Sequence, residues 1–163
     1  MVRRLFLFIC TLVLGLVAWL MFVVVAMRTR SASMLGIVRR FNRAFTNKLQ
    51  RGSAGTAGAN ASLIQHRGRK SGLTYETPIV AVADDDGFLI ALPYGADTDW
   101  VKNVFAAGSA VLITGGEVHT LARPELVPLV AVNASFSARE QNMHRWFGVE
   151  ESLRLRRGEA DRP

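Results

Sequence analysis

The chain has 163 residues, half of them hydrophobic, and this length fits a single domain rather than a multidomain assembly. Its formal net charge of +7 is uneven, because residues 1–75 hold 12 Lys or Arg and no acid, whereas residues 76–163 hold all 13 acids. Basic character confined to one part of the chain suits an anionic bilayer surface and argues against nucleic acid, for which the sequence contains no recognition module.

The first apolar run, Leu5 to Met27, has 23 positions without a charge. At about 1.5 Å per residue it is roughly 34 Å long, enough to cross the core of a bilayer. Arg3 and Arg4 would also suit a secretory signal, but a signal core is only about 7 to 15 residues long and no small-residue cleavage site closes this run. The pattern predicts an uncleaved transmembrane anchor over residues 1–30.

Flanking charge sets the expected orientation of this anchor. Arg3 and Arg4 precede it, and a larger group of cations follows it: Arg28, Arg30, Arg39, Arg40 and Arg43. The larger group is expected to stay inside, which predicts a single-pass protein of the cell membrane with its globular part facing the cytoplasm. The single cysteine, Cys10, lies within the span, so no intrachain disulfide framework points to an exported domain.

Residues 31–60 are expected to connect the anchor to the domain. Ser31 to Gln50 has apolar residues at helical spacing beside arginines, which predicts a basic amphipathic helix capped by Ser31 or Ser33. Such a helix after a span lies along the headgroups, although packing of its apolar stripe on the domain is an equal alternative. Arg51 to Ser62, rich in Gly, Ala and Ser, is predicted to be a short flexible linker.

Residues 61–157 show the period of two that is typical of strands. The predicted strands are Ser62–His66, Leu73–Ala83, Phe88–Pro93, Ala110–Thr114 and Glu117–Arg123. A turn is expected at Asp84–Gly87, and Gly115-Gly116 between apolar runs indicates a tight hairpin. Strands joined mostly by tight turns favour a small antiparallel barrel, so the predicted fold class is mainly β with flanking helices.

Helices and a last strand complete this expectation. A helix is predicted over Asp99–Ala107, capped by Asp97 or Thr98 and ended by Gly108. The remaining expected elements are a short strand at Val130–Val132, a helix at Ser137–Phe147 stopped by Gly148, a strand at Leu153–Arg157, and a disordered tail over 158–163.

The turn His66-Arg-Gly-Arg-Lys-Ser-Gly72 carries three cations, Arg67, Arg69 and Lys70. Glycines let a ligand approach the backbone closely, and the cations offer charge-assisted hydrogen bonds, so the turn suits an anion. A solvated hairpin tip is the equal alternative. It is not a P-loop, because Arg69 stands where that loop needs a glycine before its lysine.

Several ordered motifs carry a family resemblance: Gly68-Arg-Lys-Ser-Gly72, Thr77-Pro78, Leu92-Pro-Tyr-Gly95 and Asp99-Trp-Val-Lys-Asn103. Over roughly residues 61–157 the chain resembles the deazaflavin-dependent nitroreductase family of actinobacteria. The resemblance implies a split β-barrel, of the FMN-binding kind, that binds the reduced deazaflavin coenzyme F420. It also implies hydride transfer to a quinone or a nitroaromatic, and tethering at the bilayer favours a lipid-soluble acceptor.

The resemblance also implies which residues bind the coenzyme. Cations and small residues of the turn would meet its phosphate and acidic tail: Arg67, Gly68, Arg69, Lys70 and Ser71. The ring slot would be lined by Thr77, Pro78, Ile79, Tyr94 and Gly95, with Asp99, Trp100 and Asn103 beside it. In the alternative interpretation, Trp100 is ordinary core and Asp99 is a charge at the start of a helix.

Tyr94 is the candidate catalytic residue, because a phenol beside the proposed ring site can protonate the reduced acceptor. No metal site is expected, since His66, His119 and His144 lack metal-ligand spacing and are more typical of surface or structural histidines.

Two other functions stay open from the residues alone. FMN or haem would fit the same barrel, and FMN brings a phosphate that the same cations could hold. A function of another class, a non-catalytic coenzyme carrier or membrane-surface binding module, predicts tight binding without turnover. The expected partners are a small-molecule hydride acceptor and the lipid bilayer, and pairing into a homodimer is a further expectation because split barrels often pair.

Overall fold

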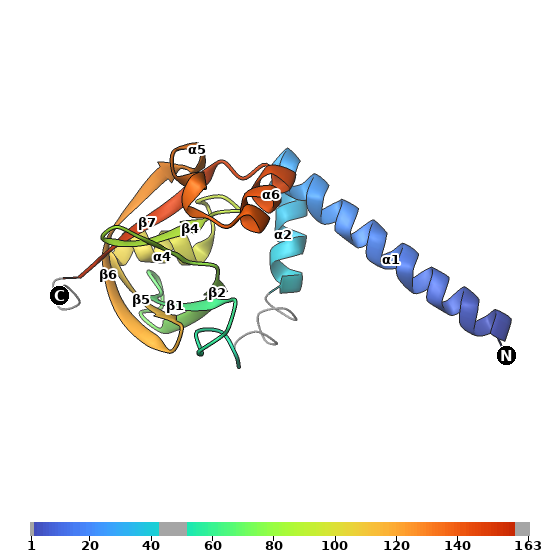
Figure 1. Cartoon of the computed structure of the whole chain (residues 1–163), viewed down its shortest axis with the longest axis horizontal. Helices are drawn as coiled ribbons and strands as arrows, with labels where there is room; N and C mark the ends of the chain where they lie inside the picture. Colours follow the sequence, from blue (N-terminus) through green and yellow to red (C-terminus); the bar gives the residue numbers. More distant parts are fainter. Residues whose placement is uncertain (1, 43–51, 159–163) are drawn as a thin grey trace.

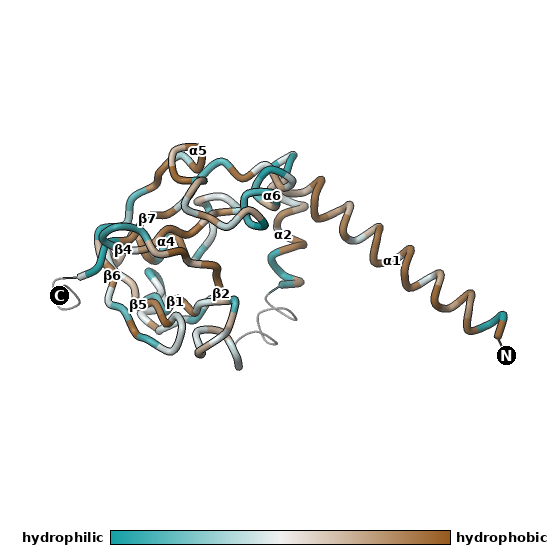
Figure 2. Tube along the Cα trace, viewed as in Figure 1, coloured by the Kyte–Doolittle hydropathy of each residue, from teal (hydrophilic) through white to brown (hydrophobic). Residues whose placement is uncertain are grey.

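The structure is a computed structural model that describes residues 2–42 and 52–158 of the chain. Its first element, α1 (Val2–Thr29), projects away from the rest of the molecule (Figure 1) and is apolar along most of its length (Figure 2). By length and composition α1 is a candidate membrane span, and its most apolar stretch is not buried in the protein. The long apolar helix expected from the sequence is therefore present.

The second helix, α2 (Ala32–Phe41), packs against the end of α1. Arg30 makes the turn between them in a left-handed conformation, with φ of 52°. Four buried residues form the contact: Ala26, Met27, Leu35 and Val38. Over α2 the predicted apolar stripe faces protein in part, because Met34 and Val38 pack in this cluster while Ile37 and Phe41 are exposed. Residues 43–50 of that predicted helix lie outside the described residues.

The domain is a curled antiparallel sheet of seven strands in the order β2-β1-β5-β6-β7-β4-β3. The strands are β1 (Ser62–Arg67), β2 (Thr74–Ile79), β3 (Val82–Asp84), β4 (Gly87–Ala91), β5 (Ser109–Thr114), β6 (Glu117–Pro128) and β7 (Glu151–Arg157). The curl makes a half-barrel with β2 and β3 at its edges, which confirms the predicted fold class (Figure 1).

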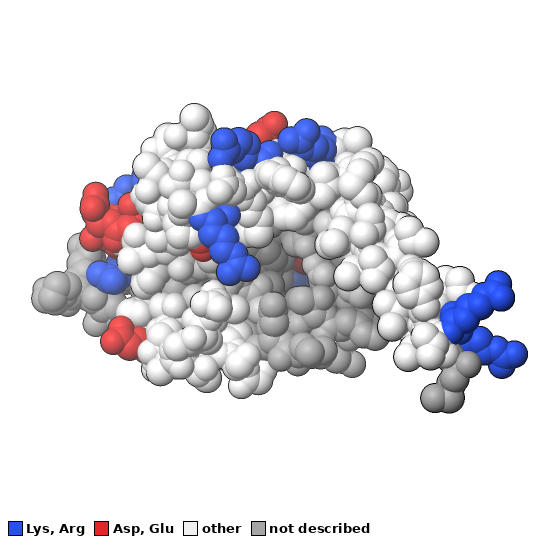
Figure 3. Space-filling view, turned by 45° about the vertical axis from the view of Figure 1, so that its right-hand side comes forward, with Lys and Arg blue, Asp and Glu red and all other residues white. Residues whose placement is uncertain are grey.

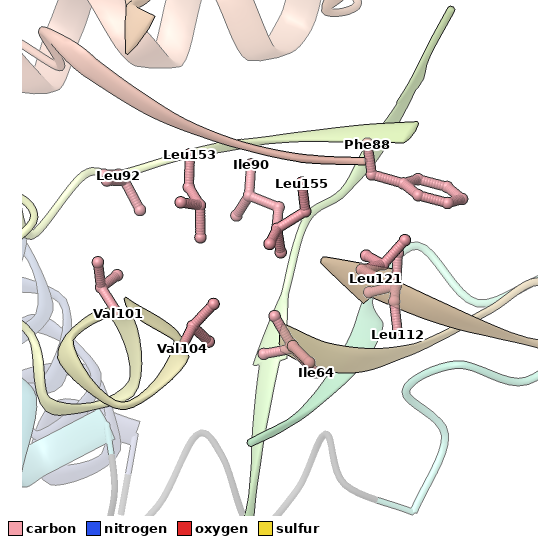
Figure 4. Close-up of a cluster of buried hydrophobic side chains, with 11 residues drawn as sticks. Ile64, Phe88, Ile90, Leu92, Val101, Val104, Leu112, Leu121, Leu153 and Leu155 are labelled. Atoms are coloured by element: carbon pink, nitrogen blue, oxygen red, sulfur yellow. The ribbon is translucent and has the colours of Figure 1, made fainter. Parts of the chain in front are cut away.

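The main core fills the concave side of this sheet. Alternate residues of the strands point inward, so one face of each strand is buried. Helix α4 (Asp99–Ala107) covers that face with Val101 and Val104. Figure 4 shows these two side chains opposite the core strands, which contribute Ile64, Phe88, Ile90, Leu112, Leu121, Leu153 and Leu155.

Three predicted strands differ in the structure, one of them only in length, since the strand expected over Glu117–Arg123 extends to Pro128 as β6. The strand expected over Leu73–Ala83 is interrupted after Ile79, and its two parts, β2 and β3, lie at opposite edges of the sheet. The strand expected at Val130–Val132 is wrong, because those residues lie in the short helix α5 (Leu129–Val132). Leu129 and Val132 bury one face of that turn, and three apolar residues are too few for periodicity to separate strand from helix.

The helix boundaries follow their predicted signals. Thr98 and Gly108 flank α4, and Gly108 ends it in the left-handed conformation with φ of 69°. Helix α6 (Ala138–Phe147) begins at a capping box of Ser137 and Glu140, which explains why its start is sharp. A short 3-10 turn, η2 (Asn133–Ser135), precedes it.

The segment predicted to be a flexible linker is held by the sheet where the structure describes it. The backbone N–H of Gly55 donates to Ala61 at 2.7 Å, and that of Gly116 donates to Gly55 at 2.7 Å. Ala54 is buried beside them. Residues 52–58 are therefore a series of turns fastened to the β5–β6 hairpin rather than a free tether.

Candidate functional site

A cleft of about 1200 Å³ lies between the sheet and helices α2 and α6. Figure 3 shows the hollow on this face of the molecule. Its walls come from the basic turn, β2, the loop after β4, the start of α4, and the facing sides of α2 and α6. Elements far apart in sequence thus meet at one cavity.

Twelve of the predicted cofactor residues line this cleft: Gly68, Arg69, Lys70, Ser71, Thr77, Pro78, Ile79, Tyr94, Gly95, Asp99, Trp100 and Asn103. Arg67 does not. Its Nε donates to the carbonyl of Gly72 at 3.3 Å, and it borders a second cavity of about 740 Å³. Arg69 borders both cavities, so Arg67 is the one cation of the turn that does not line the cleft.

Arg69 is already engaged within the protein. Its guanidinium donates to Asp99 Oδ1 at 3.0 Å and to Asn103 Oδ1 at 2.8 Å, and its backbone N–H also donates to Asn103 Oδ1. These bonds fasten the basic turn to the first turn of α4. Arg69 was expected to clamp a ligand anion, but most of its donors on this side hold α4 instead.

Lys70 differs from Arg69 in this respect. It is exposed at the cleft, and within the described part of the chain it has neither an ion pair nor a hydrogen bond. Arg39 and Arg40 of α2 also line the cleft without an ion pair to a described residue. Lys70, Arg39 and Arg40 are therefore available to bind an anion in the cleft. The two arginines come from α2, which lies outside the sequence motifs of the barrel.

A buried polar network continues from Arg69 behind the cleft wall. The Asn103 amide approaches His66 Nδ1 at 3.2 Å, and His66 Nε2 lies 3.1 Å from Thr77 Oγ1. With Asn103 Nδ2 donating, His66 is a neutral ring that donates from Nε2 to Thr77. Burial lowers the pKa of His66, with Asp99 opposing that shift, which fits the neutral form.

Acidification is expected to destabilise the protein through this network. Because the pKa of His66 is lower in the folded state than its usual value of about 6.5, the unfolded chain binds more protons below that pH. Stability is then fully present above about pH 6.5 and is lost as the pH falls through the folded pKa. Thermal unfolding of the full chain in detergent, followed from neutral to acidic pH, measures this.

His66→Gln is expected to give a shallower loss of melting temperature over that range. His144 is also buried with a lowered pKa, so some pH dependence remains in the variant. An identical pH profile in both proteins would contradict the assignment.

Tyr94 lies where the domain meets the anchor. Its hydroxyl accepts a hydrogen bond from Asn42 Nδ2, and its ring packs against the cluster formed by α1 and α2. Burial raises the pKa of Tyr94, and the bond from Asn42 opposes that shift. The phenol therefore keeps its proton at neutral pH while its oxygen is held in one position.

Thr98 is a site residue that the sequence identified only as a helix cap. Its side chain makes no capping bond, and its buried Oγ1 has no hydrogen-bond partner in the described residues. A buried hydroxyl without a partner is costly unless a ligand or water satisfies it. Thr98 lines the cleft, so its hydroxyl suits a polar atom of a bound ligand.

Comparison with known protein families assigns the chain to one of them. The family described as F420H(2)-dependent quinone reductase matches residues 37–145, more than half of the chain. The chain belongs to the F420H(2)-dependent quinone reductase family. No curated protein sequence matches it. The match includes the basic turn, the loop carrying Tyr94 and the start of α4.

Membership of the F420H(2)-dependent quinone reductase family confirms three predictions made from the sequence: the deazaflavin family, a deazaflavin-dependent oxidoreductase, and F420 as the coenzyme. The individual cofactor residues and the catalytic role of Tyr94 stay predictions. No group of three or more metal-ligating side chains occurs among residues 2–42 and 52–158.

Solved structures resemble the chain more distantly. A protein of unknown function from Agrobacterium tumefaciens is 13% identical with a TM-score of 0.45, over 61% of this chain and 48% of that one. A protein related to a general stress protein, from Clostridium acetobutylicum, is 8% identical with a TM-score of 0.46, over 61% and 75%. An F420-H2 dependent reductase is 15% identical with a TM-score of 0.38, over 59% and 93%. The chain thus spans about half the length of the first of these proteins.

Proposed function

We propose that this protein is anchored in the membrane by α1, binds reduced F420 in the cleft, and reduces a quinone there. The observation that supports this most is the composition of one cavity. It is lined by cations that have no ion pair with a described residue, by a buried hydroxyl without a partner among the described residues, and by apolar side chains. The chain that forms it is a member of the F420H(2)-dependent quinone reductase family. The anchor supports a lipid-soluble acceptor, because it holds the cleft at the bilayer.

The residues present suit the coenzyme at both of its ends. Lys70, Arg39 and Arg40 supply positive charge for a phosphate and an acidic tail. Pro78 and Ile79 offer an apolar surface for a planar ring, and Gly95 has a φ of 74°, a left-handed conformation that favours glycine. Thr98 Oγ1 adds a buried hydroxyl that has no hydrogen-bond partner among the described residues.

When bound, the reduced coenzyme supplies a hydride, which is two electrons and one proton. The quinone needs one further proton to become a hydroquinone. The Tyr94 hydroxyl is the proposed donor, and solvent returns its proton afterwards. Asn42 fixes the position of that hydroxyl, while the Arg69 contacts to α4 keep the cleft wall in place.

Lys70→Ala is expected to weaken coenzyme binding about tenfold, or roughly 1.4 kcal/mol, because it removes a cation that nothing in the described structure neutralises. Fluorescence titration of the full chain in detergent with oxidised F420 measures the dissociation constant. Arg67→Ala is the matched control, since it removes a cation of the same turn that faces the second cavity, and it should leave binding unchanged.

Equal affinity for FMN and F420 would favour the FMN alternative, whose phosphate uses the same cations. Tight F420 binding without turnover on any acceptor would favour a coenzyme carrier. Absence of saturable F420 binding to the unmodified protein would contradict the proposal. The cytoplasmic orientation of the domain and its pairing into a homodimer remain predictions.

A further inference from the structure

The cleft has a second end that the coenzyme residues do not occupy. Gly36 on α2, with Met143, His144 and Phe147 on α6, lines the cleft on the side nearest α1. We call these four residues the anchor-side end. In Figure 1, α6 and the start of α2 both lie at the end of α1 that meets the domain.

The anchor-side end is built on the last turns of the membrane helix. Phe147 packs on the cluster that joins α1 to α2, and so does Tyr94. Arg28 donates to the carbonyls of Trp146 at 3.0 Å and Arg145 at 3.3 Å. These contacts place α6 directly against the end of α1.

A contact nearer the middle of α1 indicates that α2 lies close to the bilayer. Trp19, well inside the apolar run, contacts the ring of Phe41 with centroids 4.6 Å apart. Trp146 is 67% exposed next to this junction, and tryptophan favours the interface between lipid and water. When α1 crosses a membrane, α2 and α6 therefore lie at its surface rather than at the end of a long tether.

The chemistry of the anchor-side end suits an apolar ligand. Met143 and Phe147 are apolar, and methionine adapts to ligands of irregular shape. Gly36 contributes open space, since a Cβ added there would meet no atom within 4 Å. Tyr94, with its hydroxyl fixed by Asn42, also lines the cleft and touches the same helices.

We propose that the anchor-side end is the acceptor site, and that the quinone reaches it sideways from the bilayer between α2 and α6. This inference rests on the proposed function for the identity of the acceptor. It makes the juxtamembrane helix α2 a wall of the active site, so that the domain needs its anchor segment to bind acceptor as well as to reach the membrane.

The test uses quinone binding rather than turnover. Trp19→Phe and Trp146→Phe together leave Trp100, which lines the cleft, as the only tryptophan of the chain. The full-length protein is placed in vesicles of phosphatidylethanolamine and phosphatidylglycerol and titrated with a menaquinone dissolved in the lipid. Saturable quenching of Trp100 fluorescence reports the occupied site without any coenzyme.

Gly36→Leu on this background is expected to raise the apparent dissociation constant for the quinone tenfold or more, because its side chain fills the open space. Ala32→Leu is the matched control: it adds the same side chain to an exposed position of α2 outside the cleft and should change nothing. Met143→Glu, at a partly exposed position, is the second variant should Gly36→Leu fold poorly, and it should weaken binding to the same degree.

Unsaturable quenching in the background protein, or a dissociation constant in both Gly36→Leu and Met143→Glu that equals that of the background protein, would overturn the acceptor site. A separate titration of each variant with oxidised F420 distinguishes this failure from failure of the proposed function. If the variants bind F420 normally and also bind quinone as the background protein does, the acceptor site is wrong and the proposed function stands. If the background protein does not bind F420 but its quenching still depends on Gly36, the coenzyme assignment is wrong and the acceptor site stands.

Discussion

Tyr94→Phe is expected to lower kcat for quinone reduction by about 100-fold, the lower end of what a general acid contributes. The variant keeps the ring, and with it the packing against the α1–α2 cluster, so the fold and the affinity for coenzyme should change little. What it loses is the hydroxyl that Asn42 holds in the cleft. Because burial raises the pKa of Tyr94, the phenol carries its proton at neutral pH, as a proton donor must.

The measurement is steady-state oxidation of the reduced coenzyme at saturating quinone, followed by absorbance. Tyr75→Phe is the matched control: Tyr75 is the other tyrosine of the chain and also lines the cleft, but its hydroxyl lies 3.0 Å from Ser71 Oγ at the basic turn. Asn42→Ala should give an intermediate loss of kcat, since the proton donor remains but is no longer positioned. Full turnover in Tyr94→Phe with every quinone tested would remove the catalytic role.

Gly87→Ala is expected to destabilise the domain by about 3 kcal/mol, the upper range for overpacking a tight site. Gly87 pairs with Arg156 at the start of β4, and a Cβ there would stand 1.9 Å from the carbonyl oxygen of Leu155. The obstacle is backbone, so no side-chain rotation relieves it. The strands β4 and β7 must separate locally, which disturbs the register that buries Phe88 and Leu155 together.

Thermal unfolding of the full chain in detergent should show a fall in melting temperature of about 10 °C for this change. Gly52→Ala is the control, because a Cβ at Gly52 meets nothing within 4 Å and should leave the melting temperature unaltered. A melting temperature for Gly87→Ala equal to that of the control would show that β4 and β7 are further apart than described.

Local patterns predicted much of the secondary structure. The period of two marked the strands, and the boundaries of α4 and α6 were found because a glycine or a capping residue marks each of them. Where the local signal was short, it failed. Val130–Val132 is helical because Pro128 ends β6 and the next turn buries Leu129 and Val132 against the sheet, which depends on tertiary contacts.

The candidate site was predicted only where a local sequence pattern identifies its residues. Asp99 and Asn103 were both predicted to lie beside the ring slot, and in the structure both contact Arg69, since positions four apart share a helix face. That their oxygens would occupy the Arg69 donors was not predictable, because it depends on how closely the turn approaches α4. The contribution of α2 and α6 to the cleft was missed entirely, since no spacing in the sequence links Gly36 or Met143 to residues of the barrel.

The central position of β7 also bears on how the domain assembles. Before β7 pairs, the strands form two separate blocks, β2-β1-β5-β6 and the β3–β4 hairpin, which share no other ladder. Phe88 of β4 pairs with Leu155 of β7, 67 positions later in the chain. The pairing that unites the two blocks is therefore long-range and is expected to be slow. Until then β6 and β4 each present an open edge able to pair with another chain. A chaperone that shields strand edges should therefore raise the yield of this protein more than one that shields α1.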